Sequence, residues 1–360
     1  MNIILNKRLG DPMKVLMFGP GRKVKGGIST VVNLYFSDWD FENFPMKYIS
    51  TMEDGTKLKK TFVFFLAIIK AIFIMPFYDL VHLHMASNNS FNRKRYLYKL
   101  AKVYNKKVVI HLHGAEFMQF YQFSKPSKQK QIRDVFDGAQ GVIALSEQWK
   151  TYIQTFTTTP IKVIYNAVPL PTKIQPKKNK NICFLGRIGE RKGIFDLLEV
   201  IRRLNIEYRD YEVFIGGDGD IERMNSYIQE HELHNIHYVG WIAGEKKESL
   251  LRDCAIFALP SSNEGLPMAL LEAMSYGCIP ISTYVGGIPE VIDHEKNGFL
   301  IQAKDQENLY IILKNIMNNG YDLPKMSKRA RLSIESKYSL SNSIKKLYAF
   351  YQHCYNLGVD

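Results

Sequence analysis

CAIFALPSSNEGLPMALLEAMSYGCIPISTY, residues 254–284, contains a strand, a helix and a second strand in close succession. The apolar runs at 254–261 and 278–284 are typical of buried parallel strands. Between them a Ser-Ser-Asn-Glu-Gly loop precedes Pro267, which is favoured at the first position of a helix. This order is the repeating unit of a doubly wound α/β sheet.

The same alternation recurs on both sides of the turn-rich, basic segment at 168–180. The apolar runs that predict the other strands are KVLMFG (14–19), DLVHLH (79–84), KVVIHLHG (107–114) and GVIALS (141–146) before it, and NICFLG (181–186), YEVFIGG (211–217) and IHYVG (236–240) after it. We therefore expect an α/β protein with two Rossmann-like domains, residues 1–168 and 169–340, facing each other across a cleft. Ligands of such sheets bind beyond the carboxyl ends of the strands.

Positive charge is concentrated in the N-terminal half. Residues 1–168 hold 24 Lys and Arg against 11 Asp and Glu, whereas residues 169–360 hold 24 against 24. A basic surface attracts polyanions, and each basic residue near an anionic membrane contributes about 1 kcal/mol. The interpretations left open are contact with the anionic cytoplasmic leaflet, contact with nucleic acid, and a basic surface that only aids solubility.

The cysteines and the N-terminus favour a cytoplasmic location. The four cysteines lie far apart without a Cys-x-x-Cys pair, so neither a zinc site nor a disulfide scaffold is indicated. The opening MNIILNKRLGDPMKVLMFGPG has no apolar run that ends in a small-residue cleavage site, and no secretory signal is predicted. Residues 1–12 precede the first convincing strand and are assigned no function.

The most apolar stretch is TFVFFLAIIKAIFIMPF, residues 61–77. It is shorter than the roughly 20 residues of a membrane span and carries Lys70, so a transmembrane helix is not predicted. A helix buried between strands is the favoured interpretation. The alternative is an interfacial helix that dips into the bilayer beside Lys57, Lys59 and Lys60.

Two loops of the C-terminal half carry the chemistry expected of an anion site. The amides of Gly265 and Leu266 and the positive end of the following helix suit a diphosphate, with Glu264 and Glu272 on either side of it to accept sugar and ribose hydroxyls. In FLGRIGERKG (184–193) the cations of Arg187 and Lys192 can converge on phosphate oxygens. The alternative for these two cations is plain solvation on a loop.

Four histidines end two strands of the N-terminal half. His111 and His113 share one face of a strand, His82 and His84 repeat the arrangement, and His113 is nearest the cleft. No Cys, Asp or Glu completes a ligand set, so no metal site is predicted. His82 and His111 are expected to be core histidines that hydrogen-bond to the backbone.

Glycines and a short acidic sequence mark two further turns. Gly26 and Gly27 precede a helix expected to start around Ser29, and this loop fits neither the P-loop nor the Gly-x-Gly-x-x-Gly pattern. Asp218-Gly219-Asp220 directly follows a strand, so a turn is favoured over a metal-binding carboxylate pair.

Together the Gly-Gly loop, HLHG, YNAV (165–168), GRIGERKG, GGDG and the E-x7-E spacing from Glu264 to Glu272 resemble the family 4 retaining glycosyltransferases over about residues 13–350. The resemblance implies a GT-B fold and a metal-independent reaction without a cofactor. A nucleoside diphosphate sugar, by default a UDP-sugar, donates its sugar with retention at the anomeric carbon.

The resemblance also assigns roles to residues. Arg187 and Lys192 match the diphosphate-binding pair, Glu264 the residue that reaches the donor sugar, and Glu272 the ribose ligand. His113 matches a histidine near the transferred sugar, and Gly27 a loop close to the donor phosphates. The donor-binding set also includes Gly186, Gly217, Gly265, Leu266 and Pro267. Residues 341–360 hold the last helix, which in this family crosses back to the N-terminal domain, and Asp220 stands where a proline is common.

The implied function is transfer to a glycan or polyprenyl-linked glycan in bacterial surface polysaccharide biosynthesis, peripheral to the inner face of the cell membrane and without nucleic acid. A nucleotide-sugar epimerase of the same fold is one alternative. A non-catalytic polyanion-binding protein is the other, and it would explain the charge but not Glu264, Glu272 and the donor loop.

Overall fold

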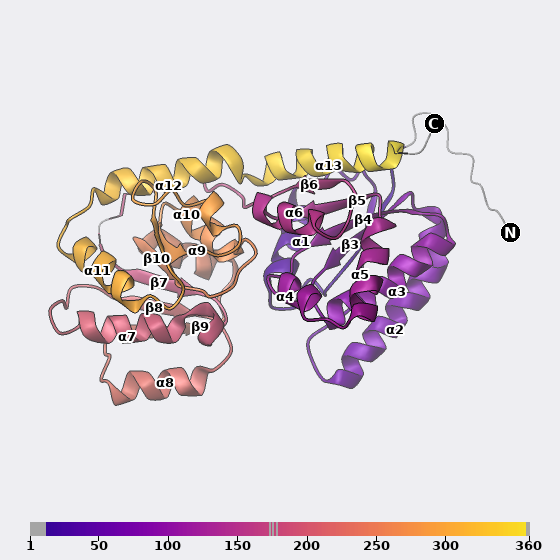
Figure 1. Ribbon diagram of the computed structural model, residues 1–360. Helices are drawn as coiled ribbons and strands as arrows, with labels where there is room; N and C mark the ends of the chain where they lie inside the picture. Colours follow the sequence, from indigo (N-terminus) through magenta and orange to yellow (C-terminus); the bar gives the residue numbers. More distant parts are fainter. Residues whose placement is uncertain (1–11, 173, 175, 178, 358–360) are drawn as a thin grey trace. The chain divides into compact units, whose positions relative to one another are not determined.

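The computed structural model describes residues 12–172, 174, 176–177 and 179–357, so the N-terminal residues 1–11 lie outside the described part. The chain divides into two compact units, one formed by residues 1–166 with 340–360 and the other by residues 167–339 (Figure 1). Each unit contains one parallel six-stranded sheet with helices packed on it.

The sheet of the first unit has the order β2-β1-β3-β4-β5-β6, and all its pairs are parallel. The central strands β1 and β3 are fully buried and are apolar except for His82 and His84 of β3. Its strands are β1 (Val15–Gly19), β2 (Met46–Ser50), β3 (Leu80–Met85), β4 (Lys107–Leu112), β5 (Gly141–Ala144) and β6 (Ile161–Val163).

Helices of the first unit bury one apolar face each against this sheet. The helices between residues 57 and 154 share a core that includes Phe18, Leu83 and Ile110 of the strands and Phe91 and Phe136 of the helices. The helices are α1 (Gly27–Asp38), α2 (Lys57–Ile74), η1 (Met75–Phe77), α3 (Asn89–Val103), α4 (Phe117–Gln122), α5 (Pro126–Asp137), α6 (Glu147–Gln154) and α13 (Leu340–Asn356).

The interpretation of 61–77 as a helix buried between strands is wrong. Only 17% of the most apolar window of this segment is buried, and Phe62 and Phe73 are 61% and 72% exposed. Ala67 and Ala71 face the core and Phe64, Ile68 and Ile74 pack against it in part, whereas most of the other large apolar side chains of the helix are exposed. Among the described residues, Lys57–Phe77 is the one helical segment long and apolar enough to cross a membrane by length and composition.

The last helix, α13, packs onto the first unit (Figure 1, yellow). Tyr348 stacks on Phe44 with ring centroids 4.0 Å apart, and its hydroxyl accepts a hydrogen bond from the backbone N–H of Asp40 at 2.6 Å. A Cβ on Gly141 would lie 2.5 Å from the ring of Phe350, so β5 approaches α13 where β5 carries no side chain. The first unit therefore needs the end of the chain to complete its core.

The sheet of the second unit has the order β12-β11-β10-β7-β8-β9 and is also parallel. Its strands are β7 (Ile182–Leu185), β8 (Val213–Gly216), β9 (Ile236–Gly240), β10 (Ile256–Leu259), β11 (Ile279–Thr283) and β12 (Phe299–Ile301). Its helices are η2 (Glu190–Lys192), α7 (Ile194–Leu204), α8 (Ile221–Glu230), α9 (Gly244–Asp253), α10 (Met268–Ser275), η3 (Ile288–Glu290), α11 (Gln306–Met317) and α12 (Leu323–Lys337).

Candidate functional site

The strand order of the second unit reverses direction between β7 and β10, which are paired neighbours. Loops that leave the carboxyl ends of two such strands run to opposite faces of the sheet and open a crevice, where doubly wound proteins bind their ligands. The loop after β7 spans residues 186–193 and the loop after β10 spans residues 260–267. Fold geometry and sequence motifs therefore select the same pair of loops.

Backbone contacts fix these two loops to each other. Gly193 has φ +72°, and a Cβ there would lie 2.1 Å from the carbonyl oxygen of Pro260. The N–H of Ser262 donates to the carbonyl of Arg191 at 2.9 Å, and Nη1 of Arg191 donates to the carbonyl of Asn263 at 2.9 Å. Lys192 is consequently held between two anchored neighbours. The sequence motifs did not single out the role of Arg191.

Lys192 and Glu264 form an ion pair where the loops meet. Nζ of Lys192 donates to Oε1 of Glu264 at 2.5 Å, and the two side chains are only 15% and 7% exposed. The same carboxylate oxygen accepts from the hydroxyl of Ser261 at 2.7 Å. A cation beside a carboxylate can bind a phosphate oxygen with the first group and a sugar hydroxyl with the second.

Glu272 has a different partner and environment. It lies in the second turn of α10, and its Oε1 accepts from Nζ of Lys247 on α9 at 2.7 Å. Burial raises the pKa of Glu272, while the charge of Lys247 and its hydrogen bond lower it. Lys247 was missed because it follows β9 without a recognisable motif.

The loop that contains Glu264 rests on a second glycine pair that the sequence motifs did not include. Gly286 has φ +57°, and a Cβ there would lie 2.1 Å from the carbonyl oxygen of Glu264. The N–H of Gly287 donates to the carbonyl of Gly265 at 2.6 Å. Pro267 is the N-cap of α10, so the helix begins at Met268, one residue later than expected.

The loops after β7 and β8 are also joined. A Cβ on Gly217 would lie 1.8 Å from the carbonyl oxygen of Gly186, so only glycine fits there. Ile188 accepts a backbone hydrogen bond from Asp220 at 3.0 Å. A proline at position 220 could not donate this bond, because proline has no N–H. Asp220, which stands where a proline is common, therefore adds a hydrogen bond between the two loops. Arg187 is exposed at the start of the loop, and none of its contacts with described residues is an ion pair.

The four histidines of the first unit form one cluster rather than separate core residues, with His82, His84 and His111 buried and His113 half-buried. Nδ1 of His84 and Nε2 of His113 are hydrogen-bonded at 2.8 Å, and the rings of His111 and His113 lie 4.0 Å apart. His82 hydrogen-bonds to the hydroxyl of Tyr351 on α13, and neither ring nitrogen of His111 has a partner among the described residues. The expectation that the backbone satisfies His82 and His111 is therefore wrong.

Burial lowers the pKa of every member of this cluster. The pKa of His113 falls to about 3 and that of His82 to about 3, the latter also through repulsion from His113. His84 and His111 shift in the same direction, with burial as the main cause. The rings are thus neutral at pH 7. Ring nitrogens of His82, His84 and His111 lie within 4.8 Å of one another, and the expectation that they bind no metal stays a prediction.

The glycine loop of the first unit is open on its outer side. α1 begins at Gly27, two residues before the expected Ser29, and a Cβ on either Gly26 or Gly27 would have no heavy atom within 4 Å. The hydroxyl of Ser29 donates to the carbonyl of Gly21 at 2.9 Å and closes the loop. Space is thus left beside the start of α1 for a ligand.

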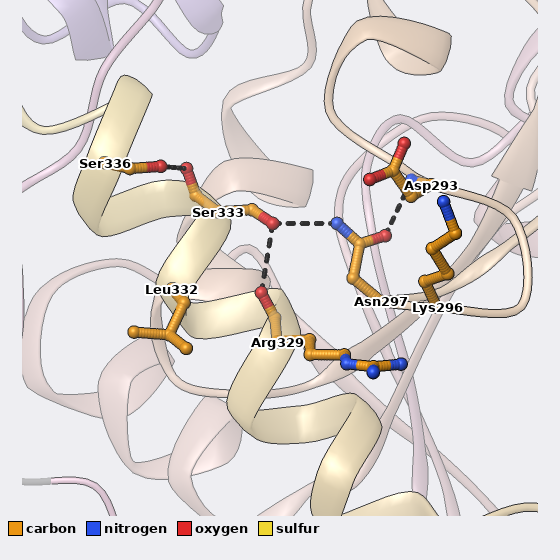
Figure 2. A pocket seen from close by; sticks show the side chains of 7 residues that line it. All are labelled: Asp293, Lys296, Asn297, Arg329, Leu332, Ser333 and Ser336. Carbon is orange, nitrogen blue, oxygen red and sulfur yellow. Dashed lines mark hydrogen bonds between the residues drawn. The ribbon is translucent and has the colours of Figure 1, made fainter.

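A shallow pocket of about 520 Å³ lies elsewhere on the second unit, between the 293–297 loop and α12 (Figure 2). Its central side chain, Asn297, accepts from the N–H of Asp293 at 2.7 Å and donates to the hydroxyl of Ser333 at 2.9 Å. None of the predicted site residues lines this pocket.

Two family models match consecutive segments of the chain. Residues 45–171 match the model for Glycosyltransferase Family 4, and residues 171–333 match the model for Glycosyl transferases group 1. The second match contains the loops with Lys192 and Glu264, and the first contains the histidine cluster.

Named relatives agree with these matches. A 41.2 kDa protein of the cps region in Klebsiella pneumoniae is 23% identical over 91% of this chain and 98% of its own length. The amylovoran biosynthesis glycosyltransferase AmsK of Erwinia amylovora is 30% identical over 46% of this chain and 43% of its own. The chain spans about half the length of several curated relatives it matches, AmsK among them.

Solved structures share the fold. Sucrose-phosphate synthase from Thermosynechococcus elongatus superposes with a TM-score of 0.79 over 96% of this chain and 100% of its own, at 16% identity. HepE from Anabaena in complex with UDP gives a TM-score of 0.76 over 95% and 100%, also at 16% identity. The two parallel six-stranded sheets with flanking helices are those of the GT-B fold.

Proposed function

Because the chain belongs to the family 4, group 1 glycosyltransferases, we propose that it transfers a sugar from a nucleoside diphosphate sugar to a glycan or lipid-linked glycan acceptor in bacterial surface polysaccharide biosynthesis. Relatives named for amylovoran and colanic acid biosynthesis support the pathway class. The observation that carries the proposal is the Lys192–Glu264 pair at the strand-order switch point of the second unit. The family match favours a transferase over the polyanion-binding alternative.

The second unit is the proposed donor-binding domain. Lys192 leaves the carboxylate of Glu264 to meet the diphosphate, together with exposed Arg187 and the amides of Gly265 and Leu266 at the start of α10. The carboxylate of Glu264 then accepts a hydrogen bond from a hydroxyl of the donor sugar. The carboxylate of Glu272 accepts hydrogen bonds from the hydroxyls of the ribose, and these replace its hydrogen bond from Lys247.

UDP is the proposed nucleotide. HepE, which shares the fold, has been solved with UDP and with UDP-glucose. Gly186, Gly217 and Pro267 keep the backbone of the donor loops close to the nucleotide.

The first unit is the proposed acceptor-binding domain. His113 is proposed to hydrogen-bond to the transferred sugar. Its lowered pKa keeps the ring neutral, so it brings no positive charge to the reacting centre. Gly27 leaves room for the donor phosphates or the acceptor beside α1.

We propose a front-face reaction that retains the anomeric configuration. The bond from the anomeric carbon to the diphosphate oxygen breaks while the bond to the acceptor oxygen forms on the same face of the sugar. The departing diphosphate takes the proton of the acceptor hydroxyl. Lys192, Arg187 and the start of α10 stabilise the negative charge on the leaving group, and one well-placed donor of this kind contributes about 3 kcal/mol. The reaction is proposed to need no metal and no further cofactor.

The enzyme is proposed to work in the cytoplasm at the inner face of the cell membrane. The excess of Lys and Arg in residues 1–168 supplies attraction to anionic lipids. A polyprenyl-linked acceptor is anchored in that leaflet, so a peripheral enzyme meets its substrate in two dimensions.

A thermal-shift screen against UDP, GDP, ADP and TDP tests the donor assignment. A ligand at 100 times its dissociation constant adds about 2.7 kcal/mol, so we expect UDP to raise the melting temperature and the other nucleotides to leave it unchanged. A shift with GDP alone would change the donor class. A shift with none of the four would contradict the proposed site.

A further inference from the structure

One face of α2 presents a continuous apolar stripe to solvent. A helix of about 3.6 residues per turn places the exposed large apolar side chains of this segment on one side. The stripe consists of Leu58, Phe62, Phe65, Leu66, Ile72, Phe73 and, from η1, Phe77. Three of these are phenylalanines of the helix itself with 60% or more of their surface exposed.

The opposite face of α2 is fixed in the first unit. Ala67, Ala71 and Met75 are at most 1% exposed and belong to its hydrophobic core. The hydroxyl of Tyr104 donates to the carbonyl of Ile72 at 3.1 Å, and Nζ of Lys106 donates to the carbonyl of Pro76 at 2.7 Å. A membrane-spanning position would pull this face out of the core, so the helix stays on the surface of its unit.

Positive charge borders the stripe. Lys59 and Lys70 fall along one edge of it and Lys57 along the other, and all three are exposed. Neither α2 nor α3 contains an acidic residue, and Asp79 is the one acid between residues 57 and 107 against 11 Lys and Arg. The combination of an apolar face with flanking cations is that of a helix that binds an anionic membrane surface.

We propose that α2 lies in the plane of an anionic lipid bilayer, with its stripe at the boundary of headgroups and acyl chains and its lysines against lipid phosphates. The biological role of this membrane contact rests on the proposed function, because the contact would place the enzyme at the membrane in which a lipid-linked acceptor is anchored. It names the structural element that makes the contact, which net charge alone does not.

Charge complementarity favours lipid over a second copy of the chain. In a two-fold dimer the same patch meets itself, so a stripe edged by lysines would face another stripe edged by lysines. Anionic headgroups neutralise those lysines. Tyr96 of α3 lies outside the stripe but is also 55% exposed, and its ring centroid lies 6.2 Å from that of Phe64 of α2. Tyrosine suits the membrane–water interface, where its ring and hydroxyl meet different environments.

Sedimentation with lipid vesicles tests the proposal. We expect the full chain to bind vesicles of phosphatidylglycerol and phosphatidylcholine, and to bind pure phosphatidylcholine weakly. The triple variant Phe62→Gln, Phe65→Gln, Phe73→Gln is expected to partition at least about tenfold more weakly. The variant Lys57→Gln, Lys59→Gln, Lys70→Gln is expected to lose most of the preference for phosphatidylglycerol.

A matched control changes three exposed apolar residues of the second unit, Ile206→Gln, Ile311→Gln and Leu332→Gln, and is expected to bind vesicles like the wild type. Equal binding by the triple phenylalanine variant and the wild type would overturn the proposal. So would a wild-type dimer that the phenylalanine changes convert to a monomer, because a second copy would then cover the stripe. The nucleotide thermal shift is measured on every variant, so vesicle binding without nucleotide binding would fault only the proposed transferase function.

Discussion

Nζ of Lys192 lies 2.5 Å from Oε1 of Glu264, inside a pair of loops whose backbones are bonded to each other. The pair holds a side chain that is only 7% exposed in place until a ligand competes for the ammonium. Each partner thus supports the fold as well as the proposed donor site, and the two contributions can be separated by substitution.

Lys192→Ala is expected to lower both stability and transfer. It leaves the carboxylate of Glu264 buried without its cation, which costs about 2–4 kcal/mol of unfolding free energy, and it removes a phosphate contact, which lowers kcat by about 10²–10³-fold. Glu264→Gln keeps the shape of the side chain, so it is expected to lower transfer with a smaller loss of stability. Urea unfolding and initial rates of sugar transfer measure the two effects.

The exposed pair of Lys314 and Glu207 supplies the control for this prediction. Its side chains are 36% and 47% exposed and solvent screens their attraction, so Lys314→Ala is expected to leave both stability and transfer nearly unchanged. Wild-type turnover by Lys192→Ala would remove this residue from the proposed site.

Gly193→Ala is expected to disrupt the donor loops. Its φ of +72° disfavours any residue with a side chain, and the new Cβ would lie 2.1 Å from the carbonyl oxygen of Pro260. We expect a loss of about 2 kcal/mol or more and a weaker thermal shift with UDP. Gly189→Ala, four residues earlier with no heavy atom within 4 Å of its Cβ, is the matched control and is expected to be tolerated. Similar melting temperatures for the two variants would argue against the proposed loop contact.

Gly27→Ala is expected to affect ligand binding without affecting the fold. The new methyl group meets open space, and alanine is favoured over glycine by up to about 1 kcal/mol within a helix, so the melting temperature should not fall. If a ligand approaches this backbone as proposed, kcat/KM should drop. Unchanged kinetics would place the ligand away from the start of α1.

Sequence patterns predicted the central strands of both sheets but missed three of the four edge strands. The strands β2, β6 and β12 are edge strands, and two of them have only three residues, so their apolar runs are too short to stand out. The apolar character of α2 was visible, but hydrophobicity does not say which face of a helix is covered. That error reflects packing, which depends on residues distant in the chain.

The predicted site was incomplete for a similar reason. Glu264 and Glu272 belong to a recognisable local motif, whereas their partners Lys192 and Lys247 come from other elements, and only Lys192 lies in a motif of its own. The bond between His82 and Tyr351 joins residues 269 positions apart. Local spacing cannot predict such contacts. The glycine pair at 286 and 287 was a visible signal, but its meaning, the close approach of this backbone to the carbonyl of Glu264, emerges only from the structure.

The histidine cluster is expected to make the protein less stable as the pH falls from 7 to 5. His82 and His113 have a pKa of about 3 when folded against 6.5 when unfolded, so over this range the unfolded chain binds protons that the folded chain does not. Each of these histidines therefore removes about 2 kcal/mol of stability between pH 7 and pH 5. Free energies of unfolding in urea at the two pH values measure the loss.

Other titrating groups do not account for this window. Lys94, with its pKa lowered to about 7, is mostly charged in both states below that value, and the lowered carboxyl of Glu199 loses its contribution only below its unfolded pKa of 4.5. Glu272 acts in the opposite direction, because burial raises the pKa of its carboxyl. His113→Gln should reduce the difference between pH 7 and pH 5 by about 2 kcal/mol, whereas His234→Gln, which removes an exposed histidine, should leave it unchanged. If both variants keep the wild-type difference, the half-buried ring of His113 is not neutral at these pH values, and its proposed role beside the transferred sugar loses its physical basis.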